Sequence, residues 1–144
     1  MSVKVGGIWE LGWNVPLSES YLWTFPLREF DVKEWAMYPV TGIVHNELYD
    51  GMVLTEYDQP MTMVNEFSED FTRIFIDEKG TTPLAELKHP ENSVYYFGRV
   101  GRSIMRECGR QEDLSVVVPT IRNTGVMWPH QILPVILYDR LMKS

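Results

Sequence analysis

The chain has 144 residues, of which 44% are hydrophobic, and it carries a formal net charge of −7 and one cysteine. This length and apolar content predict a single domain over residues 1–144 with a buried core. No apolar run suits a signal peptide or a membrane span, and the lone Cys108 excludes an internal disulfide. The three histidines lack metal-ligand spacing, so we expect no metal site. Together with the lone cysteine and the absence of an apolar run, this predicts a soluble, cytoplasmic protein without a membrane partner.

The first forty residues predict a strand, a helix and a second strand. Residues 3–10 are mostly apolar, and Ser18 then marks the start of a helix that Pro26 ends or kinks. Residues 34–38 combine aromatic and apolar side chains ahead of a proline, which is typical of a strand end. Strand, helix and strand in this order predict a right-handed parallel unit.

The middle of the chain has a weaker pattern. Glycines and prolines interrupt residues 41–70, so we expect an irregular acidic segment there, with one or two helical turns at residues 60–67. Nine acidic residues and a single arginine lie between residues 47 and 78. This segment is either a solvated face or a surface for a basic partner.

The second half of the chain predicts three more strands and a final helix. Residues 73–77, 93–97 and 114–118 are apolar runs typical of strands covered on both faces, and residues 83–87 suit a helical turn. Residues 131–141 carry apolar side chains at helical spacing. The fold class is therefore α/β, with a mostly parallel sheet of five to six strands and helices on both faces.

A glycine loop follows the predicted strand at residues 93–97. Phe97 is followed by Gly98 and, three residues later, by Gly101. Neither the GxGxxG pattern nor the GxxxxGK[ST] pattern is present, which argues against a dinucleotide or Walker-type phosphate site. The loop is either an ordinary turn or a place where backbone groups approach a ligand.

Arginines gather directly after this loop. Arg99, Arg102, Arg106 and Arg110 have spacings of three, four and four, which would align them on one face if the segment is helical. Together with Arg122 they suit contacts to RNA phosphates, although a solvated helix face gives the same pattern. Residues 1–98 contain 16 acidic and 6 basic side chains, whereas residues 99–144 contain 4 and 7, so positive charge concentrates at this end.

Three motifs in this last third resemble the SPOUT superfamily of methyltransferases, particularly its SpoU branch. They are Phe-Gly at residues 97–98, Val-Pro-Thr at residues 118–120 and Leu-Tyr at residues 137–138. The resemblance implies a C-terminal trefoil knot, a homodimer, an RNA substrate such as tRNA or rRNA, and S-adenosylmethionine as the methyl donor. It places the donor at Phe97, Gly98, Arg99, Val118, Pro119, Thr120, Gly125, Val126, Met127 and Trp128.

The catalytic motifs of the chain depart from this family. Val100 stands where the family has a glutamate, and residues 126–131 stand where it has Ser-Leu-Asn. We predict His130 as the base or orienting group and Arg28 with Arg99 as substrate clamps. Two hypotheses stay open: an RNA methyltransferase, and a catalytically silent dimeric module with the same fold.

Overall fold

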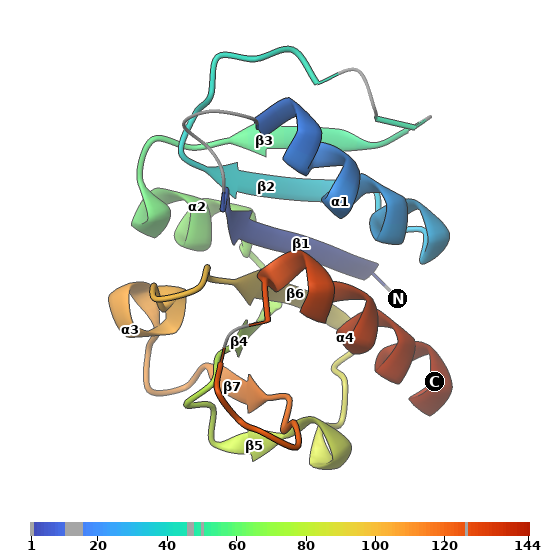
Figure 1. Cartoon of the computed structure of the whole chain (residues 1–144), viewed down its shortest axis with the longest axis vertical. Coiled ribbons are helices and arrows are strands. Elements are labelled where there is room, and N and C mark those ends of the chain that lie inside the picture. The colour runs from blue at the N-terminus through green and yellow to red at the C-terminus, as the bar shows by residue number, and fades with distance from the viewer. Residues whose placement is uncertain (1, 11–15, 46–47, 50, 126) are drawn as a thin grey trace.

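The computed structural model describes residues 2–10, 16–45, 48–49, 51–125 and 127–144, and it is built around one sheet (Figure 1). The strands in the described residues are β1 (Ser2–Ile8), β2 (Glu34–Tyr38), β3 (Val53–Glu56), β4 (Thr72–Ile76), β5 (Thr82–Pro83), β6 (Asn92–Phe97) and β7 (Leu114–Val117). All of these strands pair in parallel, in the order β3-β2-β1-β6-β4-β7-β5.

Helices cover both faces of the sheet. They are α1 (Pro16–Glu29), α2 (Pro60–Phe67), α3 (Ile104–Cys108) and α4 (Pro129–Lys143), and a short 3-10 turn spans Leu84–Glu86. Helices α1 and α4 lie side by side on one face, and α2 and α3 pack together on the other (Figure 1). The prediction of an α/β fold with helices on both faces is confirmed.

Each face has its own hydrophobic core. On the first face, Trp23 of α1 and the α4 residues Leu133 and Ile136 are buried with Trp35 of the sheet. Burial of such side chains contributes about 1.5–3 kcal/mol each relative to exposure. The core of the second face is made by α2, α3 and the strands, and its helix residues are Met63, Val64, Phe67, Ile104 and Cys108.

The five predicted strands are all present, within one residue at most bounds, but the sheet also has two short edge strands that the pattern did not predict. β3 is four residues long, and its side chains are exposed or half-buried, so no apolar run marks it. β5 contains only two residues and includes a proline. The sheet is therefore wider than expected, and it is entirely parallel across the described residues.

Three expectations about helices are corrected. α1 starts at Pro16 and continues through Pro26 to Glu29, so Ser18 does not begin the helix and Pro26 does not end it. The segment 41–70 is not irregular outside its predicted helical turns, because it also contains β3, whereas α2 matches the turns predicted at residues 60–67. α4 spans Pro129–Lys143, two residues longer at each end than predicted.

The parallel strands give the sheet a carboxyl-terminal side and an amino-terminal side. The strands all end on one side, and both chain termini lie on the other (Figure 1). Neighbouring strands β1 and β6 are followed by α1 and α3, which cover opposite faces. A reversal of this kind leaves a crevice at the carboxyl ends of the strands, where α/β sheets bind ligands. The trefoil knot implied by the family resemblance stays a prediction.

Candidate functional site

A cavity of about 400 Å³ lies at the carboxyl ends of three adjacent strands, β6, β4 and β7. Its walls come from residues that directly follow these strands and from the start of α4. This volume is in the range of small-molecule sites. The lining residues are 76–78, 97–99, 102, 117–120, 123–125, 127, 129 and 132.

The structure brings together most of the residues predicted to hold the methyl donor. They come from three separate stretches of sequence, after β6, after β7 and before α4. Trp128 does not line the cavity, and Val126 lies outside the described residues. The predicted residues that line it are Phe97, Gly98, Arg99, Val118, Pro119, Thr120, Gly125 and Met127.

Two glycines in this wall have no room for a side chain. A Cβ atom at Gly98 would collide with the backbone oxygen of Arg102, and one at Gly125 would collide with the carboxylate of Glu78. Gly125 also has a φ of 70°, in the left-handed region that favours glycine. Gly98 therefore requires glycine because the backbone of Arg102 approaches it closely, whereas Gly125 favours glycine because of its positive φ.

The four arginines after β6 do not form a helical stripe. Residues 99–102 make a tight turn, in which the Arg99 amide donates to the Arg102 carbonyl at 3.0 Å and the reverse bond measures 2.8 Å. Ser103 then caps α3, which ends before Gly109, so Arg106 is the only one of the four inside the helix. The guanidinium group of Arg102 pairs with Glu107 at 2.9 Å, and that of Arg110 donates to an asparagine side chain.

The predicted helix face is therefore wrong, because Gly101 turns the chain with a φ of 80° and the helix has only five residues. Arg99 and Arg102 line the cavity instead. Arg106 and Arg122 are exposed outside it, in α3 and in the loop after β7.

Sequence reasoning missed two carboxylates in the cavity, Asp77 and Glu78. Asp77 accepts a hydrogen bond from the Lys79 amide at 2.8 Å and another from the Ser103 hydroxyl. Glu78 lies against Gly125 and has no hydrogen bond or ion pair with any residue that the structure describes. The signal that could have found them is their position directly after β4, at the edge where the other predicted site residues end.

The two residues predicted to be catalytic do not reach the cavity. His130 is 8% exposed, and its ring lies edge-on to Trp23 and Trp128. Burial lowers the pKa of His130, and Glu19 opposes this shift. The Nε2 atom of His130 has no hydrogen-bond partner among the described residues. Arg28 lies in the last turn of α1, just before β2, and therefore near the amino ends of the strands, away from the cavity.

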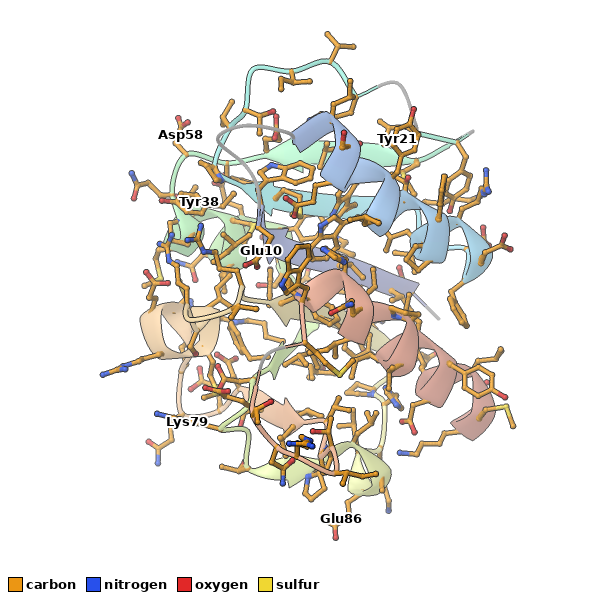
Figure 2. All side chains as sticks on the ribbon, viewed as in Figure 1. Glu10, Tyr21, Tyr38, Asp58, Lys79 and Glu86 are labelled. Carbon is orange, nitrogen blue, oxygen red and sulfur yellow. The ribbon has the colours of Figure 1, made fainter. Side chains whose placement is uncertain are left out.

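A further carboxylate lies beside the cavity, at the end of β1. Glu10, labelled in Figure 2, accepts a hydrogen bond from the Val100 amide at 3.2 Å, and its own amide donates to Glu19 at 2.7 Å. Burial raises the pKa of Glu10, the Val100 hydrogen bond and Arg99 lower it, and Glu19 adds a smaller increase. The turn at residues 99–102 thus receives a carboxylate from the segment that follows β1.

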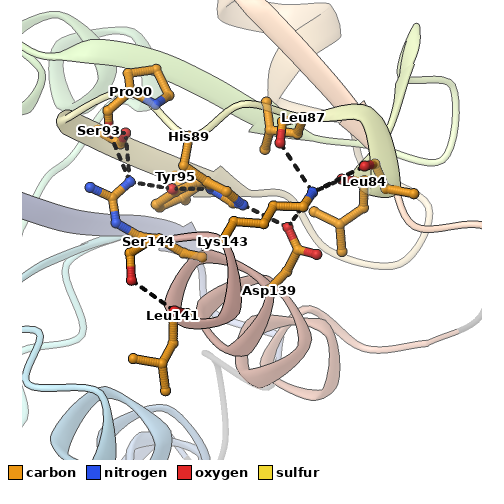
Figure 3. A network of polar contacts seen from close by, with 12 residues as sticks. Leu84, Leu87, His89, Pro90, Ser93, Tyr95, Asp139, Leu141, Lys143 and Ser144 are labelled. Carbon is orange, nitrogen blue, oxygen red and sulfur yellow. Dashed lines mark hydrogen bonds and ion pairs between the residues drawn. The ribbon is translucent and has the colours of Figure 1, made fainter.

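A separate polar network lies at the amino ends of the strands, where α4 ends (Figure 3). His89 contacts the Tyr95 hydroxyl and the Asp139 carboxylate, each at 2.7 Å. Arg140 donates to the same hydroxyl at 2.8 Å, and Lys143 pairs with Asp139 at 2.9 Å. The network ties α4 to the beginning of β6 and does not contribute to the cavity.

Two kinds of site have no support in the part of the chain that the structure describes. No group of three or more histidine, cysteine, aspartate or glutamate side chains is placed to hold a metal ion. No described helix combines the length and the apolar character needed to cross a membrane.

Comparisons with known proteins find similarity in structure. No family model matches the chain, and no curated protein does. A protein from Porphyromonas gingivalis assigned to the TrmH family of RNA methyltransferases superimposes with a TM-score of 0.72 over 99% of this chain, at 10% identity. The chain spans only 60% of the length of that protein.

Two further solved structures have a similar fold. The A. aeolicus TrmH/SpoU tRNA modifying enzyme has a TM-score of 0.71 at 14% identity, with 99% of this chain and 74% of that one covered. A structure described for the 2-OH methylation of C/U34 on tRNA has a TM-score of 0.70 at 12% identity, with 99% and 96% covered. The chain therefore shares the α/β fold of these structures, and the trefoil knot stays a prediction.

Proposed function

We propose that this chain is an S-adenosylmethionine-dependent methyltransferase that acts on RNA, such as tRNA or rRNA, in the cytoplasm. One observation carries the proposal: eight residues predicted as donor-binding, from three separate stretches of sequence, line a single cavity. The structures that share this fold and are described as acting on RNA support the choice of substrate.

The cavity fits the methyl donor in size and chemistry. Apolar side chains of Phe97, Val118, Pro119 and Met127 offer surfaces for a purine ring. The carboxylate and guanidinium groups in the wall suit the hydroxyl and amino-acid parts of the donor.

Catalysis by such a site depends mainly on positioning. When bound, the donor supplies a methyl group on a sulfonium, which a nearby oxygen or nitrogen of RNA can attack. The wall residues hold the donor, and Arg99 at the rim suits a phosphate of the substrate or the carboxylate of the donor. His130 stays our predicted base or orienting group, and it would require movement of the side chains that cover it.

A catalytically silent binding module is the second candidate. It is favoured by the positions of His130 and Arg28, because neither of these predicted catalytic side chains lines the cavity. In that case the donor would act as a ligand that stabilises the module, and methyl transfer would not occur.

Calorimetric titration with S-adenosylmethionine tests the proposal, followed by incubation with a labelled donor and bulk tRNA or rRNA. We expect saturable binding and transfer of label to RNA. Binding without transfer would favour the silent module, and no binding at millimolar donor would contradict both functions that use the cavity.

Association with RNA is a separate test. The exposed guanidinium groups of Arg99, Arg106 and Arg122 suit phosphate contacts. Contacts of this kind release counterions, so the affinity for tRNA should fall steeply between 50 and about 200 mM salt. An affinity that does not change with salt would contradict RNA binding through these arginines.

A further inference from the structure

Two of the four charged side chains in the cavity wall already have partners. Asp77 is held by the Lys79 amide and the Ser103 hydroxyl, and Arg102 is held by Glu107. Glu78 and Arg99 have no hydrogen bond or ion pair through their side chains with any other residue the structure describes. These two groups are therefore the charges that remain for a ligand.

Glu78 and Arg99 start from equivalent positions on neighbouring strands. Ile76 of β4 is paired with Phe97 of β6, and each charged residue follows two positions later. Neighbouring strands are only about 4.8 Å apart, yet the two side chains do not form an ion pair in the structure. The cavity therefore holds a negative and a positive group from neighbouring strands that do not neutralise each other.

Their side chains face opposite ends of the cavity. The Glu78 carboxylate lies against Gly125, in the loop before α4, because glycine leaves space for it there. Arg99 lies on the side of β1, where its charge lowers the pKa of Glu10. The unpaired negative group of the wall thus lies beside the loop before α4, and its unpaired positive group lies on the side of β1.

We propose that this polarity fixes the direction in which the donor lies, with Glu78 binding the ribose hydroxyls and Arg99 binding the carboxylate of the methionine part. A carboxylate has acceptor sites for both hydroxyls of a ribose, and a guanidinium group binds a carboxylate through two parallel hydrogen bonds. The inference rests on the proposed function, since it concerns the same cavity and the same donor.

Titration of three ligands against Glu78→Gln and Arg99→Gln tests the assignment. The ligands are S-adenosylmethionine, S-adenosylhomocysteine and 5′-methylthioadenosine, the last of which keeps the ribose and lacks the amino-acid part. Glu78→Gln should weaken all three by about 10- to 100-fold, the range for hydrogen bonds to a charged group. Arg99→Gln should weaken the first two by a similar factor and leave 5′-methylthioadenosine unchanged.

Glu112→Gln and Arg106→Gln are matched controls, because both residues are exposed and lie outside the cavity. They should leave all three affinities unchanged, and thermal melts should show that every variant is folded. If Glu78→Gln weakens only the two ligands with an amino-acid part, the carboxylate binds their ammonium group and the assignment is wrong.

The inference and the proposed function fail in different ways. Unchanged affinities in both cavity variants, with a wild-type chain that binds all three ligands, would overturn the orientation and leave the donor site standing. A wild-type chain that binds none of the ligands would overturn the donor site itself.

Discussion

Gly98 shows how a single missing side chain shapes the cavity wall. The residue lies between the end of β6 and the turn at residues 99–102, and the Arg102 carbonyl occupies the space that a Cβ would need. The colliding atom belongs to the backbone of the same turn, so a side chain there has to displace the turn. The identity of residue 98 therefore affects both stability and ligand binding.

We predict that Gly98→Ala lowers the free energy of unfolding by about 1–3 kcal/mol, the usual range for overpacking, and abolishes donor binding. Urea denaturation and calorimetric titration measure the two effects. Gly101→Ala is the control: its Cβ meets no atom, and its φ of 80° costs about 1–2 kcal/mol, but it lies outside the cavity and should keep binding. A Gly98→Ala chain with wild-type stability and wild-type donor binding would contradict the steric conflict at this position.

Glu10 provides a second prediction at this scale. Because burial raises its pKa in the fold, the ionised carboxylate destabilises the folded state at neutral pH, and this destabilisation disappears as the pH falls below the ordinary glutamate value. Glu10→Gln removes the charge and keeps an oxygen that can accept from the Val100 amide. We expect its melting temperature to exceed that of the wild type by about one to three degrees at pH 7.5.

The difference between this variant and the wild type should shrink as the pH falls toward 4, because protonation of Glu10 removes its buried charge. Glu112→Gln removes an exposed carboxylate and serves as the control. Its melting temperature should equal that of the wild type at both pH values. A Glu10→Gln chain that is less stable at pH 7.5 would show that the charge itself supports the turn.

At the scale of elements, the strongly apolar segments were predictable and the weakly patterned ones were not. β2 matches its predicted bounds, and β4, β6 and β7 match within one residue, because buried parallel strands are nearly continuous apolar runs. β3 and β5 were missed because pairing at the sheet edge requires little burial. The cavity was predictable as three loops that follow strands or precede a helix.

The side chains that complete the cavity depended on information the sequence does not display. Asp77 and Glu78 enter the wall because β4 lies between β6 and β7 in the sheet, and that order is not visible along the chain. The arginine stripe failed because Gly101 and Gly109 confine α3 to five residues. Spacing alone could not reveal where that helix begins and ends.

The polar network around His89 joins α4 to β6, so it tests how those two elements are held together. Arg140 donates to the Tyr95 hydroxyl, which leaves that hydroxyl to donate to Nδ1 of a neutral His89 whose Nε2 donates to Asp139. Burial lowers the pKa of His89, and Asp139 opposes the shift. Stability from the neutral imidazole is therefore present above pH 6.5 and is lost as the pH falls toward the lower pKa of the fold.

We predict that His89→Gln lowers the free energy of unfolding by about 1–3 kcal/mol at pH 7.5, because buried groups lose hydrogen-bond partners. Its melting temperature should also fall less between pH 7 and 5 than that of the wild type. Calorimetric scans across this range measure both effects, with Lys88→Gln at the exposed neighbouring position as the control. Parallel curves for wild type and His89→Gln would show that another group controls the acid sensitivity.

At the scale of the whole molecule, the outer surface of α1 and α4 is unusually apolar. The two helices lie side by side on one face of the sheet (Figure 1). Large exposed apolar patches usually mark surfaces that a partner covers. The large apolar residues exposed on these helices are Leu17, Tyr21, Leu22, Phe25, Val135, Tyr138, Leu141 and Met142.

We propose that this face forms a homodimer interface, as the family resemblance implies. Light scattering after size exclusion should then give twice the 16.8 kDa mass of the chain. Leu22→Glu combined with Leu141→Glu places charges on both helices, and desolvating them in a dimer is unfavourable, so the mass should fall to that of one chain. Val44→Glu changes a more exposed apolar residue in a loop and should leave the dimer intact. Both substituted helix residues are exposed in the single chain, so a variant that unfolds, or a wild type of 16.8 kDa, would contradict this interface.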